Sequence, residues 1–435
     1  MSNYEIHHNN NRSHISEVPE GWKLKRLKYL TKSKKELSET GEEELLSVTE
    51  TRGIIKRKEL KSDDEPLSRS DDLIGYRLVE EGNLVNNIML VWKRGLGVSP
   101  YSGIVSPAYS VFSFSKECDP WYFNYLLRSE EYITEFRRNS TGITMSRLRL
   151  YDDSFGDVFG VLPPLNEQKI ISRYLDKKTS QIDKLISKIK KRIELLKEQR
   201  TSLINQYVTK GLDPNVEMKD SGVEWIGEIP RHWEMRKITH ATTLIGSGTT
   251  PKSDNEAYYL DGATNWLVTG DLNDGYVIQT SSKVTEKALK DHSSLKLYPT
   301  GSLLMAMYGA TIGKLGILKV EVTVNQATCV MNFNENNSVE FWFNVLFGNR
   351  NYIVSLGYGG GQPNISQGLI KSLRFPCPPT IKEQLEIVEA IKSRIGKHDS
   401  VIQMEHKRLL LSKEYRQSFI SSVVTGKVRV TEEMI

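Results

Sequence analysis

The richest combination of chemical groups in this sequence is the glycine-flanked stretch Gly309-Ala310-Thr311-Ile312-Gly313-Lys314-Leu315. A Walker-type phosphate loop has the pattern G-x-x-x-x-G-K followed by Ser or Thr, whose hydroxyl binds magnesium. Here only three residues separate Gly309 from Gly313, and Leu315 follows Lys314. The stretch therefore does not predict nucleotide binding.

Other catalytic patterns are also missing from the sequence. The eight histidines do not have the spacing of metal ligands, and H-E-x-x-H does not occur. DNA amino-methyltransferases hold their target base with Asp, Asn or Ser before a Pro-Pro pair and an aromatic residue after it. The Pro-Pro pairs here are Leu162-Pro163-Pro164-Leu165 and Cys377-Pro378-Pro379-Thr380, and the Pro-Asp element of many nucleases is absent. We therefore expect no active site, no metal and no cofactor in this chain.

The remaining candidates are polar, basic and aromatic side chains on glycine-flanked loops, residue types that can reach the phosphates and base edges of a nucleic acid. In the first half the candidates for such contacts are Lys93, Arg94, Tyr101, Ser102, Arg147 and Arg149. In the second half they are Thr249, Lys252, Trp266, Tyr308, Thr311, Lys314 and Gln326. Core packing explains Trp266 and Tyr308 equally well, and a surface salt bridge would explain Arg147.

An internal duplication must organise the elements that position these residues. Val18-Pro19-Glu20-Gly21-Trp22 matches Ile229-Pro230-Arg231-His232-Trp233, 211 positions later. Further matches follow in the same order, with offsets that stay between 211 and 219. They include Leu162-Pro163-Pro164 with Cys377-Pro378-Pro379, Asp183 with Asp399, and Arg200 with Arg416. An ordered series of this kind indicates two copies of one folding unit.

Each copy ends in a long segment with a seven-residue apolar repeat. From Glu167 to about Thr209 the repeat consists of Leu175, Ile182, Ile189, Leu196 and Leu203. From Glu383 to about Thr425 it consists of Val388, Ile395, Ile402 and Leu409. This spacing predicts helices of a left-handed coiled coil, and one long helix cannot bury such a stripe alone. We predict that the two helices pair antiparallel; the alternative is two independent helices over separate cores.

The first of these helices is strongly basic. It contains 12 Lys and Arg but only five Asp and Glu, a net charge of +7 (12 − 5). A solvated face is the ordinary explanation for such a run. A helix that lies along a DNA backbone, or that binds an acidic partner, explains it equally well.

The remaining sequence favours an α+β fold with two mixed α/β domains. Ser110–Phe114 and Thr328–Phe333 are β-branched and aromatic stretches typical of strands, and short helices are expected near Asp119–Arg137 and Glu340–Asn351. We place a first globular domain at 1–162, the first long helix at 163–212, a connection at 213–228, a second globular domain at 229–376 and the second long helix at 377–435.

Composition limits the compartment and the partners. The net charge of +5 (59 − 54) and pI of about 8.8 permit a polyanionic partner without requiring one. The three cysteines are far apart and suggest a reducing compartment. There is no apolar run of about 18 residues, and the polar tail Met1–Ser16 lacks a signal peptide's apolar core. We expect a cytoplasmic protein that does not bind membranes.

The sequence resembles the specificity (HsdS) subunits of type I restriction-modification enzymes over nearly its whole length after Glu17. Ser221–Trp233 resembles the segment that opens the family's second recognition domain, and Pro163–Gln168 and Pro378–Gln384 resemble the starts of its helical regions. Gly246–Pro251, Asn265–Leu272 and Tyr308–Gly313 resemble a common type of recognition domain, which accounts for the incomplete phosphate loop.

The resemblance implies two target recognition domains that each read one half of a bipartite, asymmetric site on double-stranded DNA. It implies that the paired helices act as a spacer that sets the gap between the half-sites. The helices would also dock two methyltransferase subunits and, through them, restriction/translocase subunits. AdoMet, ATP and Mg would then belong to the partner subunits. The competing hypotheses are a coiled-coil scaffold with two protein-binding modules and an enzyme with an unfamiliar site.

Overall fold

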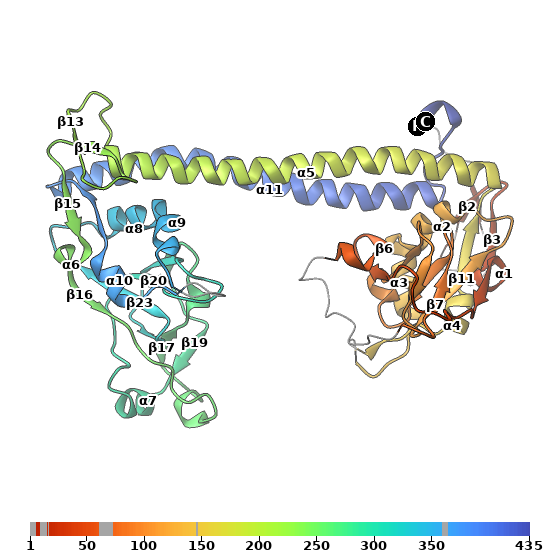
Figure 1. Ribbon diagram of the computed structural model, residues 1–435, viewed down its shortest axis with the longest axis horizontal. Helices are drawn as coiled ribbons and strands as arrows, with labels where there is room; N and C mark the ends of the chain where they lie inside the picture. The colour runs from red at the N-terminus through yellow and green to blue at the C-terminus, as the bar shows by residue number, and fades with distance from the viewer. Residues whose placement is uncertain (1–5, 9–14, 16, 61–72, 145–146, 359–363) are drawn as a thin grey trace. The chain divides into compact units, whose positions relative to one another are not determined.

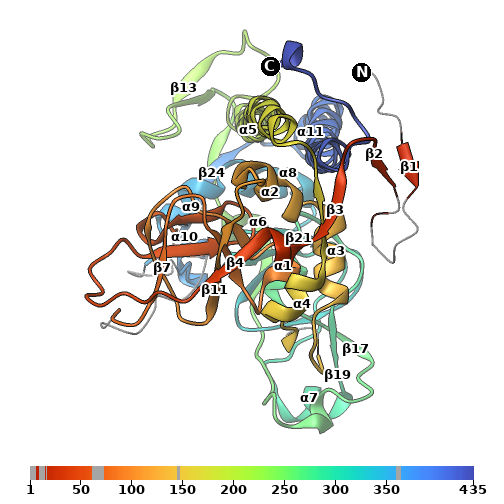
Figure 2. The ribbon, with the colours of Figure 1, turned by 90° about the vertical axis from the view of Figure 1, so that its right-hand side faces the viewer.

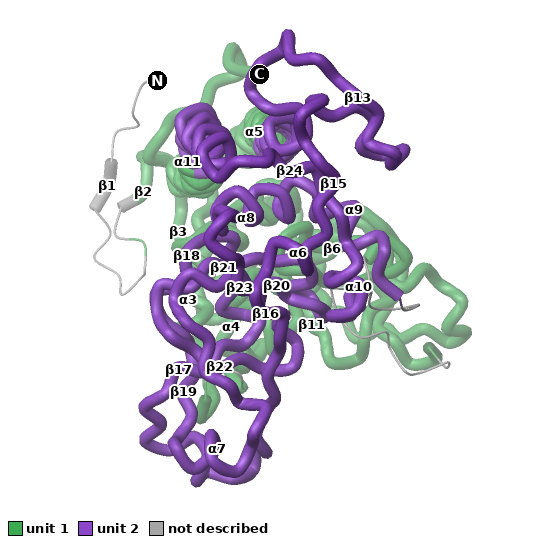
Figure 3. The backbone as a smooth tube through the Cα atoms, turned by 90° about the vertical axis from the view of Figure 1, so that its left-hand side faces the viewer, with its two compact units in different colours: residues 1–190, 407–435 green, residues 191–406 purple. Residues whose placement is uncertain are grey.

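The computed structural model describes residues 6–8, 15, 17–60, 73–144, 147–358 and 364–435; most of the polar N-terminal tail lies outside this set. The chain forms two compact units, residues 1–190 with 407–435 and residues 191–406 (Figure 3). Their borders are separated by 216 positions (406 − 190). The same offset separates Asp183 from Asp399 in the duplicated sequence (399 − 183). Each unit therefore contains one globular domain together with parts of both long helical segments, and the two units are related by the offset of the repeat.

The first unit is built around an antiparallel four-stranded sheet in the order β4-β11-β8-β9. Helices α2 and α3 bury Tyr122, Phe123, Tyr132 and Phe136 in its main core. The elements are β1 (Ile6–His8), β2 (Glu17–Pro19), β3 (Lys23–Arg26), α1 (Leu27–Leu30), β4 (Thr31–Lys34), β5 (Leu46–Thr49), β6 (Gly53–Lys56), β7 (Arg77–Val79), β8 (Leu84–Asn87), β9 (Leu96–Val98), β10 (Gly103–Val105), β11 (Tyr109–Phe114), α2 (Pro120–Leu127), α3 (Glu130–Arg138), α4 (Asp152–Asp157) and β12 (Phe159–Leu162).

The second unit repeats this plan with the sheet order β16-β23-β20-β21-β18. Between β16 and β20 it has the strands β17, β18 and β19 and the helix α7, where the first unit has β5, β6 and β7 between β4 and β8 (Figure 1). The elements are β13 (Met218–Asp220), β14 (Glu228–Pro230), β15 (Glu234–Lys237), α6 (Ile238–Ala241), β16 (Thr242–Gly246), β17 (Thr264–Leu267), β18 (Gly275–Val277), β19 (Ser282–Val284), α7 (Glu286–Asp291), β20 (Leu303–Ala306), β21 (Leu315–Leu318), β22 (Thr323–Val324), β23 (Thr328–Phe333), α8 (Val339–Gly348), α9 (Arg350–Ser355), α10 (Gln367–Ser372) and β24 (Arg374–Cys377).

Both predicted strands are present, as β11 and β23, whereas each predicted short helix is interrupted. The segment 119–137 forms α2 and α3, and the segment 340–351 lies in α8 and α9. The break in the first domain falls at Arg128 and Ser129, where the Ser129 side chain donates to the Leu126 carbonyl at 2.8 Å. Side-chain bonds of Ser to nearby backbone groups favour such a turn over a continuous helix.

The two long helices are α5 (Leu165–Lys210) and α11 (Ile381–Val424), and within each unit they pair antiparallel (Figures 1 and 2). In the first unit Tyr174 packs against Phe419, and Arg416 donates to the Asp183 carboxylate at 2.8 and 3.0 Å. In the second unit Arg192 pairs with Glu405 at 3.3 Å, and Arg200 Nε donates to Asp399 Oδ1 at 2.7 Å. The residue numbers of the partners on α11 fall from 419 to 399 as those on α5 rise from 174 to 200. The two helices therefore run antiparallel, as predicted.

The apolar residues of the seven-residue repeat face the partner helix and the globular domains. Leu175, Ile189, Val388 and Ile395 are buried, and Ile182, Leu196, Leu203, Ile402 and Leu409 are half-buried. Ile186 and Ile193, which lie four residues after members of the first series, are buried as well. Within the described part of the chain, no helix combines the length and the apolar character that a membrane span requires.

Each long helix begins on its own globular domain through one repeated set of hydrogen bonds. Trp22 Nε1 donates to Glu167 Oε2 at 3.0 Å, and Trp233 Nε1 donates to Glu383 Oε1 at 2.7 Å. The next residue is a fully buried glutamine in both copies. Gln168 Oε1 accepts from the Asp119 amide at 2.7 Å, as Gln384 Oε1 does from the Ser338 amide at 2.8 Å. These bonds tie the first turn of each long helix to the N-terminus of α2 or α8.

The same tryptophans contact the end of the other long helix. Gly211, just after α5, lies against Trp233, and Gly426, just after α11, lies against Trp22 and Pro19. Both glycines have a positive φ, 73° and 78°, as expected where a helix ends in the left-handed conformation. Each domain therefore holds the beginning of one long helix and the end of the other.

Replacing Gly426 by Ala should destabilise the first unit. A Cβ would lie 2.2 Å from Pro19 Cγ, and the φ of +78° is strained for any L side chain. Overpacking and left-handed strain together predict a loss of about 2–4 kcal/mol. Gly396→Ala is the matched control, because Gly396 lies within α11 with nothing near its Cβ position, so Ala should stabilise by about 0.5–1 kcal/mol. Urea unfolding measures both, and a Gly426→Ala midpoint equal to wild type would contradict this packing.

Candidate nucleic-acid interface

The connection between β8 and β9 carries two of the predicted DNA contacts in the first domain. Lys93 is exposed, with its Nζ 4.9 Å from the centroid of the Trp92 ring. Arg94 ends a short 3-10 helix with a left-handed φ of 63°. Its guanidinium donates to the Arg128 carbonyl at 3.3 Å and pairs with Glu130. Lys93 is therefore available to a ligand, whereas Arg94 is engaged within the domain.

Arg147 and Arg149 belong to a second loop beside this connection. Thr141 and Arg149 form a β-bridge that closes the loop, and the Leu150 amide donates to the Ile88 carbonyl at 2.9 Å. Both arginines are exposed and line a shallow cavity with Met89, Thr141, Gly142, Ile143, Leu148 and Tyr151. No ion-pair partner of either side chain is found among the described residues, which exclude 145–146. The salt-bridge interpretation of Arg147 thus has no partner in the described structure.

Tyr101 and Ser102 lie at the other end of these strands. They follow β9, and Ser102 Oγ accepts from the Glu81 amide at 3.3 Å in the turn before β8. The Tyr101 ring packs on the core of Leu46 and Val48 and has Lys56 Nζ 5.0 Å from its centroid. The structure therefore separates these two residues from Lys93, Arg147 and Arg149. Whether they contact DNA stays a prediction.

In the second domain the connection between β20 and β21 takes the place of the Lys93 loop. Tyr308, Thr311 and Lys314 lie on it and are half-buried. Gly309 and Gly313 have positive φ values of 82° and 75°, which explains the glycines of this stretch. The Ile365 amide donates to the Met307 carbonyl at 2.7 Å, the counterpart of the Leu150 bond to Ile88.

The other predicted contacts of the second domain gather beside this connection. The Met307 amide donates to the Ala327 carbonyl at 2.8 Å, which brings Gln326 next to Tyr308. Gln326 Oε1 accepts from Thr250 Oγ1 at 2.6 Å, beside Thr249 and the exposed Lys252. The structure thus brings Gln326 and Thr250 close to Tyr308, whereas it divides the predicted contacts of the first domain.

Trp266 is bound to the same segment but is part of the core. Its Nε1 donates to the Thr249 carbonyl at 3.3 Å, and its ring meets Tyr259 edge-on at 5.8 Å. Only 7% of the residue is exposed. This burial favours the core-packing interpretation of Trp266 over stacking on a base. For Tyr308, burial raises the pKa of the phenol, and the ring packs against the main core of the domain.

Two arginines that were not predicted from the sequence form hydrogen bonds with these loops or with residues that contact them. Arg128 Nη1 donates to the Arg94 carbonyl at 3.0 Å, and its Nη2 donates to the Glu50 carbonyl at 3.0 Å. Burial lowers the pKa of Arg128 to about 10, so the group remains charged at neutral pH. Arg350 in the second domain donates to Asp274 Oδ2 at 3.1 Å. The duplication gave no signal for them, because Arg128 and Arg350 do not occupy matched positions.

Most of the basic residues of α5 are exposed. Of its 12 Lys and Arg, ten are exposed and two, Lys178 and Arg200, are half-buried. Arg192 and Arg200 pair with carboxylates of α11, and Lys197 pairs with Glu194 on the same helix. These pairs account for only part of the positive charge.

The cysteines are structural rather than reactive. All three are buried and free of disulfides. Burial raises the pKa of the Cys118 thiol to about 11 and those of Cys329 and Cys377 to about 12. Because the thiolate is the nucleophile, these thiols are inert at neutral pH. In the described parts of the chain no cluster of His, Cys, Asp and Glu is arranged to hold a metal ion.

Comparisons with known proteins agree on one family. A sequence model of the type I restriction modification DNA specificity domain matches residues 230–408. The type I restriction enzyme MjaVIII specificity subunit of Methanocaldococcus jannaschii is 26% identical, over 96% of this chain and 95% of the relative. The putative MjaX specificity subunit of the same organism is 25% identical over 96% of both chains.

A solved structure shares the fold. It is a chain from work on complex assembly and conformational transition of the type I R-M system, and it superposes with a TM-score of 0.70. The match covers 94% of this chain and 99% of that chain at 13% identity.

Arg147 and Arg149 provide the test of the loop in the first domain. The double variant Arg147→Gln/Arg149→Gln should weaken binding to duplex DNA and reduce the slope of log K against log salt by about two, because two phosphate contacts are lost. Equilibrium titrations at several salt concentrations measure both quantities. Lys116→Gln is the control, since Lys116 is exposed beyond the far end of β11. An unchanged affinity and slope in the double variant would rule out DNA contact by this loop.

Proposed function

Because this chain belongs to the family of type I restriction enzyme specificity subunits, we propose that it reads a bipartite, asymmetric DNA site, with one half read by each globular domain. The observation that carries the proposal is one sheet plan used twice with different loops. β4-β11-β8-β9 corresponds to β16-β23-β20-β21, whereas the loops after β8 and β20 carry different side chains. Identical frameworks give the two readers a common geometry, and different loops give them different half-sites.

The role of the chain is recognition rather than catalysis. Specificity subunits are the DNA-recognising members of type I restriction-modification enzymes, and the chemistry belongs to other subunits. AdoMet would be held by methyltransferase partners, and ATP and Mg by restriction/translocase partners. Methylation of a base within a duplex also requires that the base be flipped out, which those methyltransferase partners would perform.

The duplicated helix surfaces support docking of two methyltransferase subunits. The pair Asp183–Arg416 in the first unit and the pair Asp399–Arg200 in the second use matched residues from opposite copies. Two equivalent surfaces on one chain are what two identical partners would need. Restriction/translocase subunits would then join through the methyltransferase subunits. The exposed basic residues of α5 are available for an acidic partner surface or for DNA phosphates.

An exchange of one domain tests the proposal. Residues 27–158 lie between the paired strands β3 and β12, so replacing them with the same segment of another specificity subunit keeps both strands and the Trp22–Glu167 bond at the start of α5. Co-expression with the methyltransferase subunit, followed by mapping of methylated bases in genomic DNA, should show one half of the motif changed. The other half and the gap should stay the same, because the second domain and both helices are untouched.

The reciprocal exchange of residues 238–373, between β15 and β24, is the matched control and should change only the other half. A change in both halves after either single exchange would contradict independent reading by two domains. The complete absence of methylation that depends on the wild-type chain would refute the function itself.

A further inference from the structure

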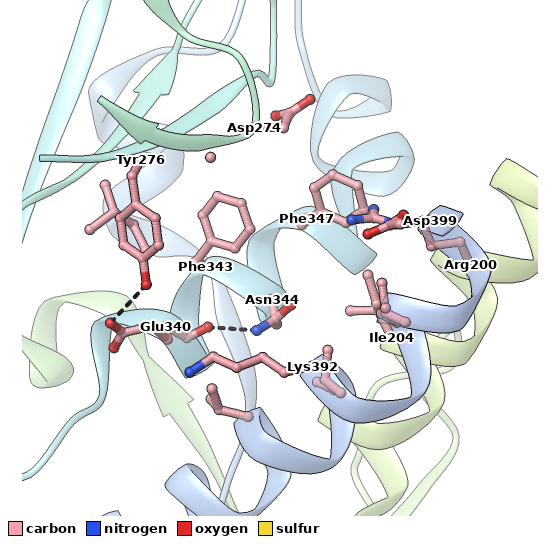
Figure 4. A pocket seen from close by; sticks show the side chains of 16 residues that line it. Arg200, Ile204, Asp274, Tyr276, Glu340, Phe343, Asn344, Phe347, Lys392 and Asp399 are labelled. Carbon is pink, nitrogen blue, oxygen red and sulfur yellow. Dashed lines mark hydrogen bonds and ion pairs between the residues drawn. The ribbon is translucent and has the colours of Figure 1, made fainter. Parts of the chain in front are cut away.

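A cavity of about 300 Å³ lies in the second unit where α8 faces α5 and α11 (Figure 4). Its lining is mainly apolar, with Ile204, Phe343, Ile391 and Ile395 among the residues. At one end stands a row of five side chains that we call the Arg350 row. In order it contains Asp399, Arg200, Phe347, Arg350 and Asp274.

The Arg350 row alternates acids, cations and an aromatic ring. Arg200 Nε lies 2.7 Å from Asp399 Oδ1, and the Arg200 Cζ lies 4.9 Å from the centroid of the Phe347 ring. The Arg350 Cζ lies 4.8 Å from the same centroid. Arg350 then binds both carboxylate oxygens of Asp274. Each guanidinium therefore has its own carboxylate, and the ring between them attracts both cations.

The Asp274 end of the row is bonded to the residue at which the β20–β21 connection ends. The Asp274 amide donates to the Leu315 carbonyl at 3.0 Å, and Asp274 Oδ1 accepts from the Leu315 amide at 3.0 Å. Arg350 also packs against Gly313, where a Cβ would lie 3.0 Å from Arg350 Cγ. The row thus runs from the long helices to the connection that carries Tyr308, Thr311 and Lys314.

The first unit has a corresponding arrangement made from different residues. A cavity beside α5 and α11 is lined by Arg94, Arg128, Asp183 and Arg416. Asp183 and Arg416 form the helix-to-helix ion pair, and Arg128 donates to carbonyls of the β8–β9 connection. In both units an arginine from the helical layer thus stands between a helix-to-helix ion pair and a predicted DNA-reading loop. The two units reach this arrangement with different residues, which indicates that the arrangement itself is required.

We propose that Arg350 is a positioning residue for sequence recognition, which holds the β20–β21 connection in a fixed place relative to the long helices. This inference rests on the proposed function. A planar guanidinium bound to both oxygens of one carboxylate fixes direction as well as distance, which a flexible apolar contact does not. The loop then meets its half-site with one defined register. In the first domain Arg128 would hold the β8–β9 connection through bonds to backbone carbonyls instead, among them those of Arg94 and Glu50.

The test uses the full chain in complex with its methyltransferase subunits and a DNA library in which both half-sites and the gap are randomised. Methylation of each sequence is counted for wild type and for Arg350→Met. The variant should lose about ten-fold in discrimination at the second half-site, about the value of one good base contact, and none at the first.

Further variants separate positioning from folding. Arg350→Met alone leaves a half-buried carboxylate without its partner, so the double variant Asp274→Asn/Arg350→Met removes both charges together. Asn also tolerates the left-handed φ of 64° at position 274. The double variant should fold and should show the same loss at the second half-site. Arg350→Lys should recover part of the discrimination, and Arg374→Met, at an exposed position in β24 away from the long helices and the predicted DNA contacts, should match wild type.

Wild-type discrimination in the double variant would overturn the inference, as would equal losses at both half-sites. These outcomes are distinct from failure of the proposed function. In that case the wild-type complex itself would give no two-part motif.

Discussion

The pairing of α5 with α11 is the constraint on which the rest of the structure depends. A helix of 46 residues with a narrow apolar stripe is not stable in water by itself. Burial of the stripe by a second copy supplies the driving force, while the pairs Asp183–Arg416 and Arg200–Asp399 select the register. Exposed ion pairs contribute only about 0–1 kcal/mol each, so their importance here lies in alignment rather than in stability.

This pairing also explains how the globular domains are attached. Trp22 binds Glu167 at the start of α5 and packs against Gly426 after the end of α11. Trp233 makes the same two contacts with the helices exchanged. Each domain can make both contacts only if one long helix ends where the other begins, which requires that the helices pair antiparallel. The duplication of the sequence and the antiparallel pairing of the helices thus explain why both domains are attached in the same way.

The long helices could be predicted closely from the sequence, because a sustained seven-residue repeat leaves few alternatives. The expected segments 167–209 and 383–425 correspond to 165–210 and 381–424. The duplication held further information, since the matched pairs Asp183 with Asp399 and Arg200 with Arg416 are the residues that bond across the helices. Residues that repeat in both copies are candidates for contacts between the copies.

The loops could not be predicted to the same depth. Their positions depend on contacts distant in sequence, such as Arg350 with Asp274 and Arg128 with Glu50. Composition alone grouped Tyr101 with Lys93, although β9 separates them, and it could not tell the core position of Trp266 from an exposed one. Where the two copies differ, as at Arg128 and Arg350, the duplication offers no guide.

A matched pair of insertions tests most directly whether the helix pair sets the spacing of the two readers. One heptad inserted after Lys190 in α5 and one after His406 in α11 lengthen both helices at matched positions and keep the apolar stripe in phase. Each insertion adds about 10 Å, which is roughly the length of three base pairs of DNA. Methylation mapping should show both half-sites unchanged and a longer gap, by up to about three base pairs. An unchanged gap with full methylation would contradict the account.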